Sequence, residues 1–111
     1  MKRIVFDLDG TICQIKEKDQ TYLDVLPIKE VIEKIRELKS KNWYIIISTA
    51  RHMVTCGGNV DLVKNRIGNQ TIDWLLKYNI PYDEIQFGKP YGEYYVDDKA
   101  LNLKDFINKE F

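Results

Sequence analysis

The sequence lacks any long hydrophobic run. No apolar stretch among its 111 residues approaches the roughly 20 residues needed to cross a bilayer. The first residues, MKRIVFDLDG, hold only Ile4, Val5 and Phe6 before a charge, which is too short for the core of a secretory signal. We therefore expect a cytoplasmic protein with no membrane span.

Cysteine is scarce as well, with Cys13 and Cys56 as the two in the chain. They have no CxxC spacing and no secretory signal precedes them, so the pattern indicates neither a disulfide framework nor a zinc site. We expect both to be reduced thiols.

Net charge is the third absence, because 17 basic and 17 acidic residues cancel. A balanced chain has no general attraction for nucleic acid or for anionic membrane. Any anion must therefore be bound by a local site, and no nucleic-acid partner is expected.

What the sequence does hold is the composition of one compact soluble domain, with 44% apolar and 31% charged residues. Hydrophobic periodicity predicts strands and helices in alternation. The strands are expected over residues 3–8, 43–48, 83–88 and 94–98, and the helices over 27–41, about 60–79 and 101–111. This alternation is typical of an α/β fold with a mostly parallel sheet and right-handed crossovers.

Polar residues collect where the predicted strands end, and open α/β sheets bind ligands at that edge. They are Asp7 and Asp9, then Ser48, Thr49 and Arg51, then Gly88 and Lys89, and finally Asp97 and Asp98. Clustered carboxylates repel one another and suit a hard divalent cation. Because no histidine cluster or thiolate pair accompanies them, Mg²⁺ is favoured over zinc.

An acidic site with magnesium suggests a phosphate substrate, whose own negative charge needs cations and donors around it. Lys89, Thr49 and the backbone N–H groups of Gly10 and Thr11 are the candidates for that cradle. Thr49 is preferred over Ser48 because it directly precedes Ala50 and Arg51 at the turn.

Four segments in order, DLDGT, IIISTAR, FGKP and YYVDDK, resemble the motifs of the haloacid dehalogenase-like (HAD) superfamily. The resemblance implies one Rossmann-like catalytic domain over 1–111, with strand order 3-2-1-4 and helices on both faces. The gaps after the first two motifs leave room for a short flap at 13–26 and a mobile loop at 51–60, but for no separate cap domain.

The resemblance also implies a role for each matching residue. Asp7 is the expected nucleophile, which becomes an aspartyl phosphate, and Asp9 is the expected general acid and base. The expected phosphate- and substrate-binding residues are Gly10, Thr11, Thr49, Ala50, Arg51 and Lys89, and the expected magnesium ligands are Asp7, Asp9, Asp97 and Asp98. Whether Asp98 ligates directly or orients the other ligands is left open.

The function expected from these roles is magnesium-dependent hydrolysis of a phosphate monoester. The motifs resemble small bacterial phosphatases of capsule or polysaccharide biosynthesis, which suggests a sugar phosphate. Closure of the site by the flap, by a bulky substrate or by a second subunit remains open. The alternatives are a silent phosphate-binding module and a receiver-like phospho-acceptor domain, although a receiver carries its acidic pair on the first strand and its lysine on the last.

Three local alternatives also remain open. Arg51 and His52 either recognise the substrate or lie solvated in a loop. Cys56, beside two glycines, is expected to be an inert thiol. The tyrosines at 91, 94 and 95 are expected to pack at the core and rim rather than to stack on a sugar.

Overall fold

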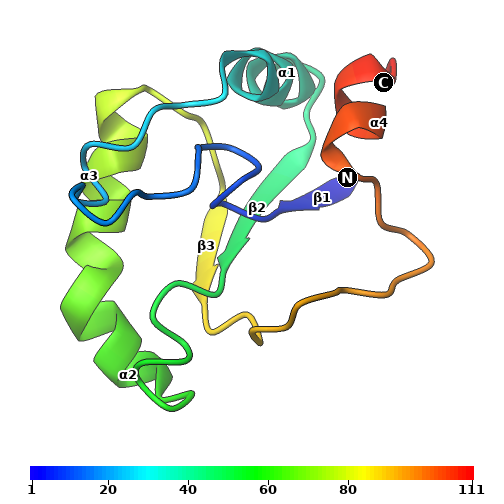
Figure 1. Cartoon of the computed structure of the whole chain (residues 1–111). Helices are drawn as coiled ribbons and strands as arrows, with labels where there is room; N and C mark the ends of the chain where they lie inside the picture. The colour runs from blue at the N-terminus through cyan, green and yellow to red at the C-terminus, as the bar shows by residue number, and fades with distance from the viewer.

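The computed structural model describes residues 1–111 and contains a three-stranded parallel sheet (Figure 1). Its strands are β1 (Arg3–Phe6), β2 (Tyr44–Thr49) and β3 (Glu84–Phe87), in the order β1-β2-β3. Val5 lies opposite Ile46 in the parallel register, and Ile46 lies opposite Glu84. The predicted α/β class and the first three strands are confirmed, with boundaries shifted by a residue or two.

The helices connect and flank these strands. They are α1 (Lys29–Ser40), α2 (Val60–Val63), α3 (Asn69–Lys77) and α4 (Leu103–Asn108), with a π-helical segment η1 (Lys64–Gly68) between α2 and α3. In α1 the apolar residues at helical spacing, Val31, Ile32, Ile35 and Leu38, are all buried, as their spacing predicts. No helix has both the length and the apolar character needed to cross a membrane.

The main core lies between the helices and one face of the sheet. Phe6, Ile45 and Ile47 point into it and meet side chains of α1, α3 and α4. Successive strand residues point to opposite faces, so Arg3, Val5 and Tyr44 lie on the other face, where Val5 is 61% exposed. The expected cover of helices on both faces is therefore wrong, because the crossovers from β1 to β2 and from β2 to β3 run in the same direction across the sheet, and right-handed crossovers then place α1 and α3 on one face.

The expected fourth strand at 94–98 is also wrong, so the sheet has the 3-2-1 part of the predicted strand order 3-2-1-4 and lacks its fourth member. This segment has no strand structure, and Val96 is fully exposed. Only residues 88–93 separate it from the end of β3, whereas a crossover to a parallel strand takes about a dozen residues or more. The chain is therefore too short here to return to the start of the sheet and pair with β1.

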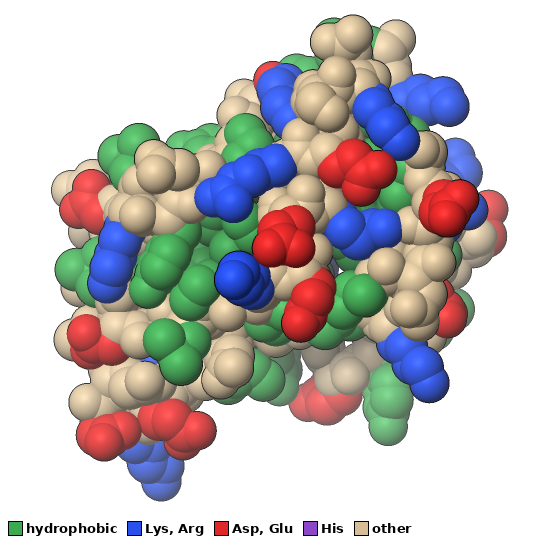
Figure 2. Space-filling model, turned by 90° about the horizontal axis from the view of Figure 1, so that it is seen from above, with side chains coloured by type: hydrophobic (Ala, Val, Ile, Leu, Met, Phe, Trp, Pro, Cys, Tyr) green, Lys and Arg blue, Asp and Glu red, His purple; other side chains and the backbone are tan.

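The segment 13–26 contains turns and is fixed at its base. Gln14 N donates to Leu26 O at 2.9 Å, and the indole Nε1 of Trp74 donates to Val25 O at 2.9 Å. Residues 51–58 after β2 form successive turns. On the face shown in Figure 2, basic and acidic side chains are interspersed, in keeping with the zero net charge.

Candidate active site

Asp7 and Asp9 follow directly after β1 and line one pocket of about 690 Å³. The other walls come from three segments: Ile15 and Tyr22 of 13–26, residues 50–55 after β2, and Tyr91, Gly92, Glu93 and Tyr95 after β3. The structure thus brings together the two acids of the first motif and the turn of the second. Half of the 14 lining residues are hydrophobic, so the pocket suits a ligand with an apolar part beside its charged group.

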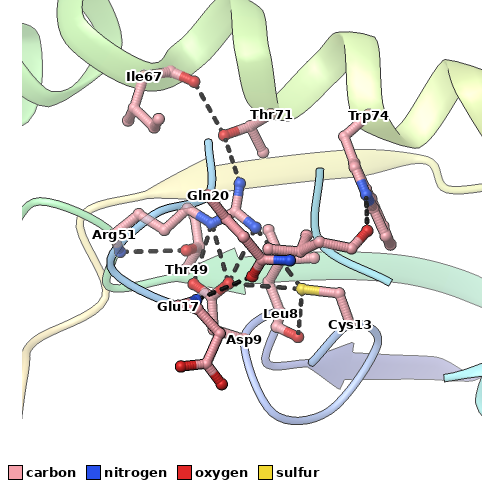
Figure 3. Close-up of polar contacts among 11 residues, drawn as sticks. Leu8, Asp9, Cys13, Glu17, Gln20, Thr49, Arg51, Ile67, Thr71 and Trp74 are labelled. Atoms are coloured by element: carbon pink, nitrogen blue, oxygen red, sulfur yellow. Dashed lines mark hydrogen bonds and ion pairs between the residues drawn. The ribbon is translucent and has the colours of Figure 1, made fainter. Parts of the chain in front are cut away.

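Asp9 is held by Arg51 (Figure 3). Arg51 Nε lies 2.9 Å from Asp9 Oδ2 and 3.2 Å from Oδ1, and Arg51 Nη2 lies 2.9 Å from Oδ1. A guanidinium that contacts both oxygens in this way fixes the orientation of the carboxylate. The turn after β2 therefore fixes the second acid of the first motif.

Arg51 itself is buried, with 4% of its surface exposed, so the alternative of a solvated loop residue is wrong. Its Nη1 donates to Thr71 Oγ1 at 3.1 Å, and Thr71 in turn donates to Ile67 O at 2.9 Å. The Tyr22 ring covers the guanidinium, with its centroid 4.1 Å from Arg51 Cζ. Most donors of Arg51 are used inside the protein, so it supports Asp9 and has little left for a substrate.

Cys13 lies on the same network. Its Sγ is 3.4 Å from Asp9 Oδ1 and 3.6 Å from Arg51 Nη2. Burial, followed by the charge of Asp9, raises the pKa of the Cys13 thiol to about 12. Both cysteines are free, as predicted, and Cys13 is a neutral hydrogen-bonding group beside Asp9.

Asp7 has a different partner from Asp9. Lys89 Nζ lies 3.4 Å from Asp7 Oδ1, and the Asp7 side chain is 39% exposed. The Tyr95 ring centroid lies 4.2 Å from Lys89 Nζ. Lys89 and the candidate nucleophile Asp7 therefore meet as the motifs predict. The Asp7 carboxylate is partly exposed and faces the pocket.

The position of Lys89 depends on its backbone. Gly88 N and Lys89 N both donate to Thr49 O, at 3.2 and 3.1 Å. Gly88 has φ +107°, and a Cβ there would lie 2.8 Å from Val60 Cγ2. This glycine lets the chain turn sharply at the end of β3 and bring Lys89 back toward β1.

The Ser48 and Thr49 alternatives differ in burial. Thr49 is buried, and its Oγ1 accepts a hydrogen bond from Arg51 N at 3.1 Å. Ser48 is half-buried on the opposite side of the strand. Neither lines the pocket, whereas Ala50 does. In this structure the Thr49 hydroxyl stabilises the turn that carries Arg51. A contact of Thr49 with phosphate stays a prediction.

The backbone cradle expected at Gly10 and Thr11 is not present as predicted. Gly10 N donates to Cys13 O at 2.7 Å, and Thr11 N donates to Leu8 O at 3.2 Å. These N–H groups close the turn after β1, since Gly10 has φ +81°, and they are not free for an anion.

The predicted magnesium ligands are only half assembled. Carboxylates suit Mg²⁺, and Asp7 and Asp9 share the pocket, but Asp97 and Asp98 lie on the exposed segment after β3 and do not line it. The structure contains no group of three or more His, Cys, Asp or Glu side chains that could hold a metal ion. A hydrogen bond from Lys99 N, then one with Asp98, lowers the pKa of Asp97. As arranged here, the residues do not fit a complete magnesium site.

His52 completes the wall of the pocket. Its ring stacks at a tilt on Tyr22, with centroids 5.7 Å apart, and its buried Nδ1 has no hydrogen-bond partner. Burial, then the charges of Arg66, Arg51 and Lys16, lower the pKa of His52. The ring is therefore neutral near pH 7 and presents an uncharged surface.

Several residues of this site were not expected from the sequence. Thr71 and Cys13 contact Arg51, and Tyr22 covers it. Thr71 sits on α3, far along the chain, and carries no local signal. Tyr95 was expected to pack at the core or rim, and its contact with Lys89 gives it a closer link to the site.

Known proteins resemble this chain in sequence and in fold. The sequence model of the haloacid dehalogenase-like hydrolase family (Hydrolase_3) matches residues 4–74. A crystal structure of a protein from Vibrio cholerae is 41% identical, with a TM-score of 0.92, over 99% of this chain and 90% of that one. A search of curated protein sequences found no significant match.

Two more distant solved structures share the fold. One is a Pnkp1/Rnl/Hen1 complex, at 20% identity and a TM-score of 0.58, over 97% of this chain and 34% of that one. The other is D,D-heptose 1,7-bisphosphate phosphatase from B. bronchiseptica, solved with magnesium and phosphate. It is 21% identical, with a TM-score of 0.54, over 90% of this chain and 54% of that one. At these identities the likeness concerns the fold alone.

Proposed function

Because this chain belongs to the haloacid dehalogenase-like hydrolases, we propose that it is a phosphatase that cleaves phosphate monoesters through an aspartyl phosphate on Asp7. One observation carries the proposal. Two carboxylates that follow the same strand line one pocket but have different partners. Asp7 is exposed beside Lys89, and Asp9 forms a salt bridge with the buried Arg51. Different surroundings give two carboxylates different roles.

In the first step a carboxylate oxygen of Asp7 attacks phosphorus, and the bond from phosphorus to the leaving oxygen breaks. Lys89 offsets part of the negative charge that gathers between the two anions. Since Lys89 Nζ is already 3.4 Å from Asp7 Oδ1, a phosphoryl group on that carboxylate lies within reach of the ammonium. Asp9 donates a proton to the leaving oxygen, which departs as an alcohol.

In the second step water attacks the phosphorus of phospho-Asp7, and Asp9 removes its proton. The contacts from Arg51 hold the Asp9 carboxylate in place for this step.

Magnesium dependence is part of the proposal and has two supports. The phosphatase from B. bronchiseptica, which shares the fold, was solved with magnesium and phosphate, and Asp7 and Asp9 offer the oxygen donors that Mg²⁺ prefers. When bound, the ion would neutralise charge between carboxylates and phosphate. The ligand set needs Asp97 or Asp98 to join the pocket, so no step above is routed through the metal.

The proposed substrate is a small phosphate ester, with a sugar phosphate of polysaccharide biosynthesis as the specific candidate. The pocket of about 690 Å³ accommodates a leaving group of that size. Tyr22, Tyr91 and Ile15 are among its lining residues and provide surfaces for the apolar face of a ring. The polysaccharide assignment depends on the resemblance of the motifs.

Trapping the intermediate tests the proposed chemistry. Wild-type protein with magnesium and an aryl phosphate is quenched with hydroxylamine, which converts an aspartyl phosphate to a hydroxamate that mass spectrometry locates. We expect the hydroxamate on Asp7 in the wild type and in Asp9→Asn, whose second step is slowed. A hydroxamate on another residue, or none during turnover, would contradict the assignment.

A further inference from the structure

Residues 90–102, here called the arm, leave the end of β3, project from the body and return to α4 (Figure 1). Tyr94 is 89% exposed and Val96 is fully exposed. The residues from 90 to 101 make no backbone–backbone hydrogen bond. The arm therefore presents apolar side chains and free backbone groups that its own chain does not cover.

The arm keeps a defined shape at its base. The Tyr95 hydroxyl donates to Pro90 O at 2.6 Å and accepts from Gly92 N at 3.2 Å. The far end is anchored as well, because Phe106 of α4 packs edge-on against Phe6, with centroids 5.2 Å apart. The arm is an extended segment held at both ends, not a free tail.

β1 offers a matching surface. It pairs with β2 on one side only, so its outer edge has unpaired N–H and C=O groups. An open edge is a template for strand addition, and Val5 on it is largely exposed. The arm cannot supply a parallel strand to its own β1, because residues 88–93 are too few for the crossover.

We propose that the arm of one copy adds as a parallel strand to β1 of a second copy, and the reverse, in a two-fold symmetric dimer. Such an exchange is isologous, because arm and edge belong to the same chain. It brings Glu93 of one copy to the end of β1 that holds Lys2 and Arg3 of the other. It also brings Asp97 and Asp98 to the pocket end of that strand, which completes an acidic site that each chain lacks alone.

Oligomeric state gives the first test and does not depend on activity. Light scattering after size exclusion should find the wild type as a dimer and Val96→Lys as a monomer. Val96 is fully exposed, so its replacement leaves the folded chain intact, which circular dichroism checks. The matched control is Leu76→Lys, at another exposed apolar site on α3, which should remain dimeric. A monomeric wild type, or a Val96→Lys dimer, would overturn the exchange.

Complementation tests which chain supplies the acids, and this part rests on the proposed phosphatase function. Asp7→Asn and the double variant Asp97→Asn/Asp98→Asn are assayed alone and after unfolding and refolding together. With exchanged arms each mixed dimer holds one complete site, so the mixture should regain about a quarter of wild-type activity. Two inactive variants that stay inactive when mixed show that each chain uses its own acids, which overturns the exchange. If the wild type hydrolyses no ester, the proposed function fails, while the light-scattering result still decides the dimer.

Discussion

The buried guanidinium of Arg51 contacts both carboxylate oxygens of Asp9, with Nε 2.9 Å from Oδ2 and Nη2 2.9 Å from Oδ1. The pair joins the turn after β2 to the turn after β1. It gives Asp9 a different partner from Asp7, which faces Lys89 and solvent. The division of labour between the two acids depends on this contact.

Arg51→Met should weaken both the fold and the activity, because it leaves Asp9 without its partner. Removing one member of a buried pair costs about 3–5 kcal/mol, and because the Asp9 side chain is 29% exposed we expect about 1–3 kcal/mol. Denaturant unfolding measures the loss. Arg36→Met is the matched control, since Arg36 makes a single exposed contact with Tyr78 O. Equal losses in the two variants would refute a special role for Arg51.

Gly88→Ala should displace Lys89 from Asp7. The new Cβ would lie 2.8 Å from Val60 Cγ2, at a backbone φ of +107°. Gly57→Ala is the control, because Gly57 also has a positive φ but a Cβ there would meet nothing within 4 Å; it should cost about 1–2 kcal/mol through strain alone. We expect a larger loss of stability and of phosphate release in Gly88→Ala. Val60→Ala should restore part of both, and no rescue would show that the clash is not the cause.

The sequence was sufficient to predict those helices and strands that are marked by a local pattern of apolar residues. The spacing of apolar residues in α1 and the buried run of β2 predict those elements well, and the motif residues Asp7 and Lys89 meet as expected. The prediction of a fourth strand was wrong because it relied on the β-forming residues Tyr94, Tyr95 and Val96. The strand propensity of these residues does not depend on whether the connection is long enough to reach β1.

The contacts around Arg51 could not be predicted from the sequence either. Arg51 was predicted to contact substrate, and its burial arises from Thr71, Cys13 and Tyr22, which come from three separate segments. Such contacts depend on tertiary packing, and no local pattern marks them. The helices lie on one face because both crossovers between the observed strands run in one direction, and this strand order depends on tertiary pairing.

His52 should titrate below its ordinary pKa of 6.5, because burial and then Arg66, Arg51 and Lys16 disfavour its charged form. A folded-state pKa below the unfolded value adds stability above pH 6.5 that is lost as the pH falls through the folded pKa. His52 is the one histidine of the chain, so its ring protons are identified directly by proton NMR. Arg66→Gln should raise the midpoint toward 6.5. A wild-type midpoint at or above 6.5 would contradict this environment.

Cys13 should make stability fall at alkaline pH. Its pKa is raised from 9.0 to about 12 in the folded protein, so the folded state keeps a proton that the unfolded state loses. The associated stability is full below pH 9 and declines between pH 9 and about 12, by at most about 1.4 kcal/mol per pH unit. Cys13→Ala should lack this part of the decline in unfolding experiments between pH 8 and about 10.5. Parallel curves for the two proteins would be inconsistent with a buried neutral thiol.

The most direct test of the proposed function is magnesium-dependent release of inorganic phosphate from an aryl phosphate and a panel of sugar phosphates, by the wild type and by Asp7→Asn. Asn is isosteric with Asp but has no carboxylate to attack phosphorus, so the fold should persist while turnover stops. The account predicts release by the wild type, loss of release when magnesium is chelated, and no release by Asp7→Asn. Equal turnover by the two proteins would contradict the central claim that Asp7 carries the phosphoryl group.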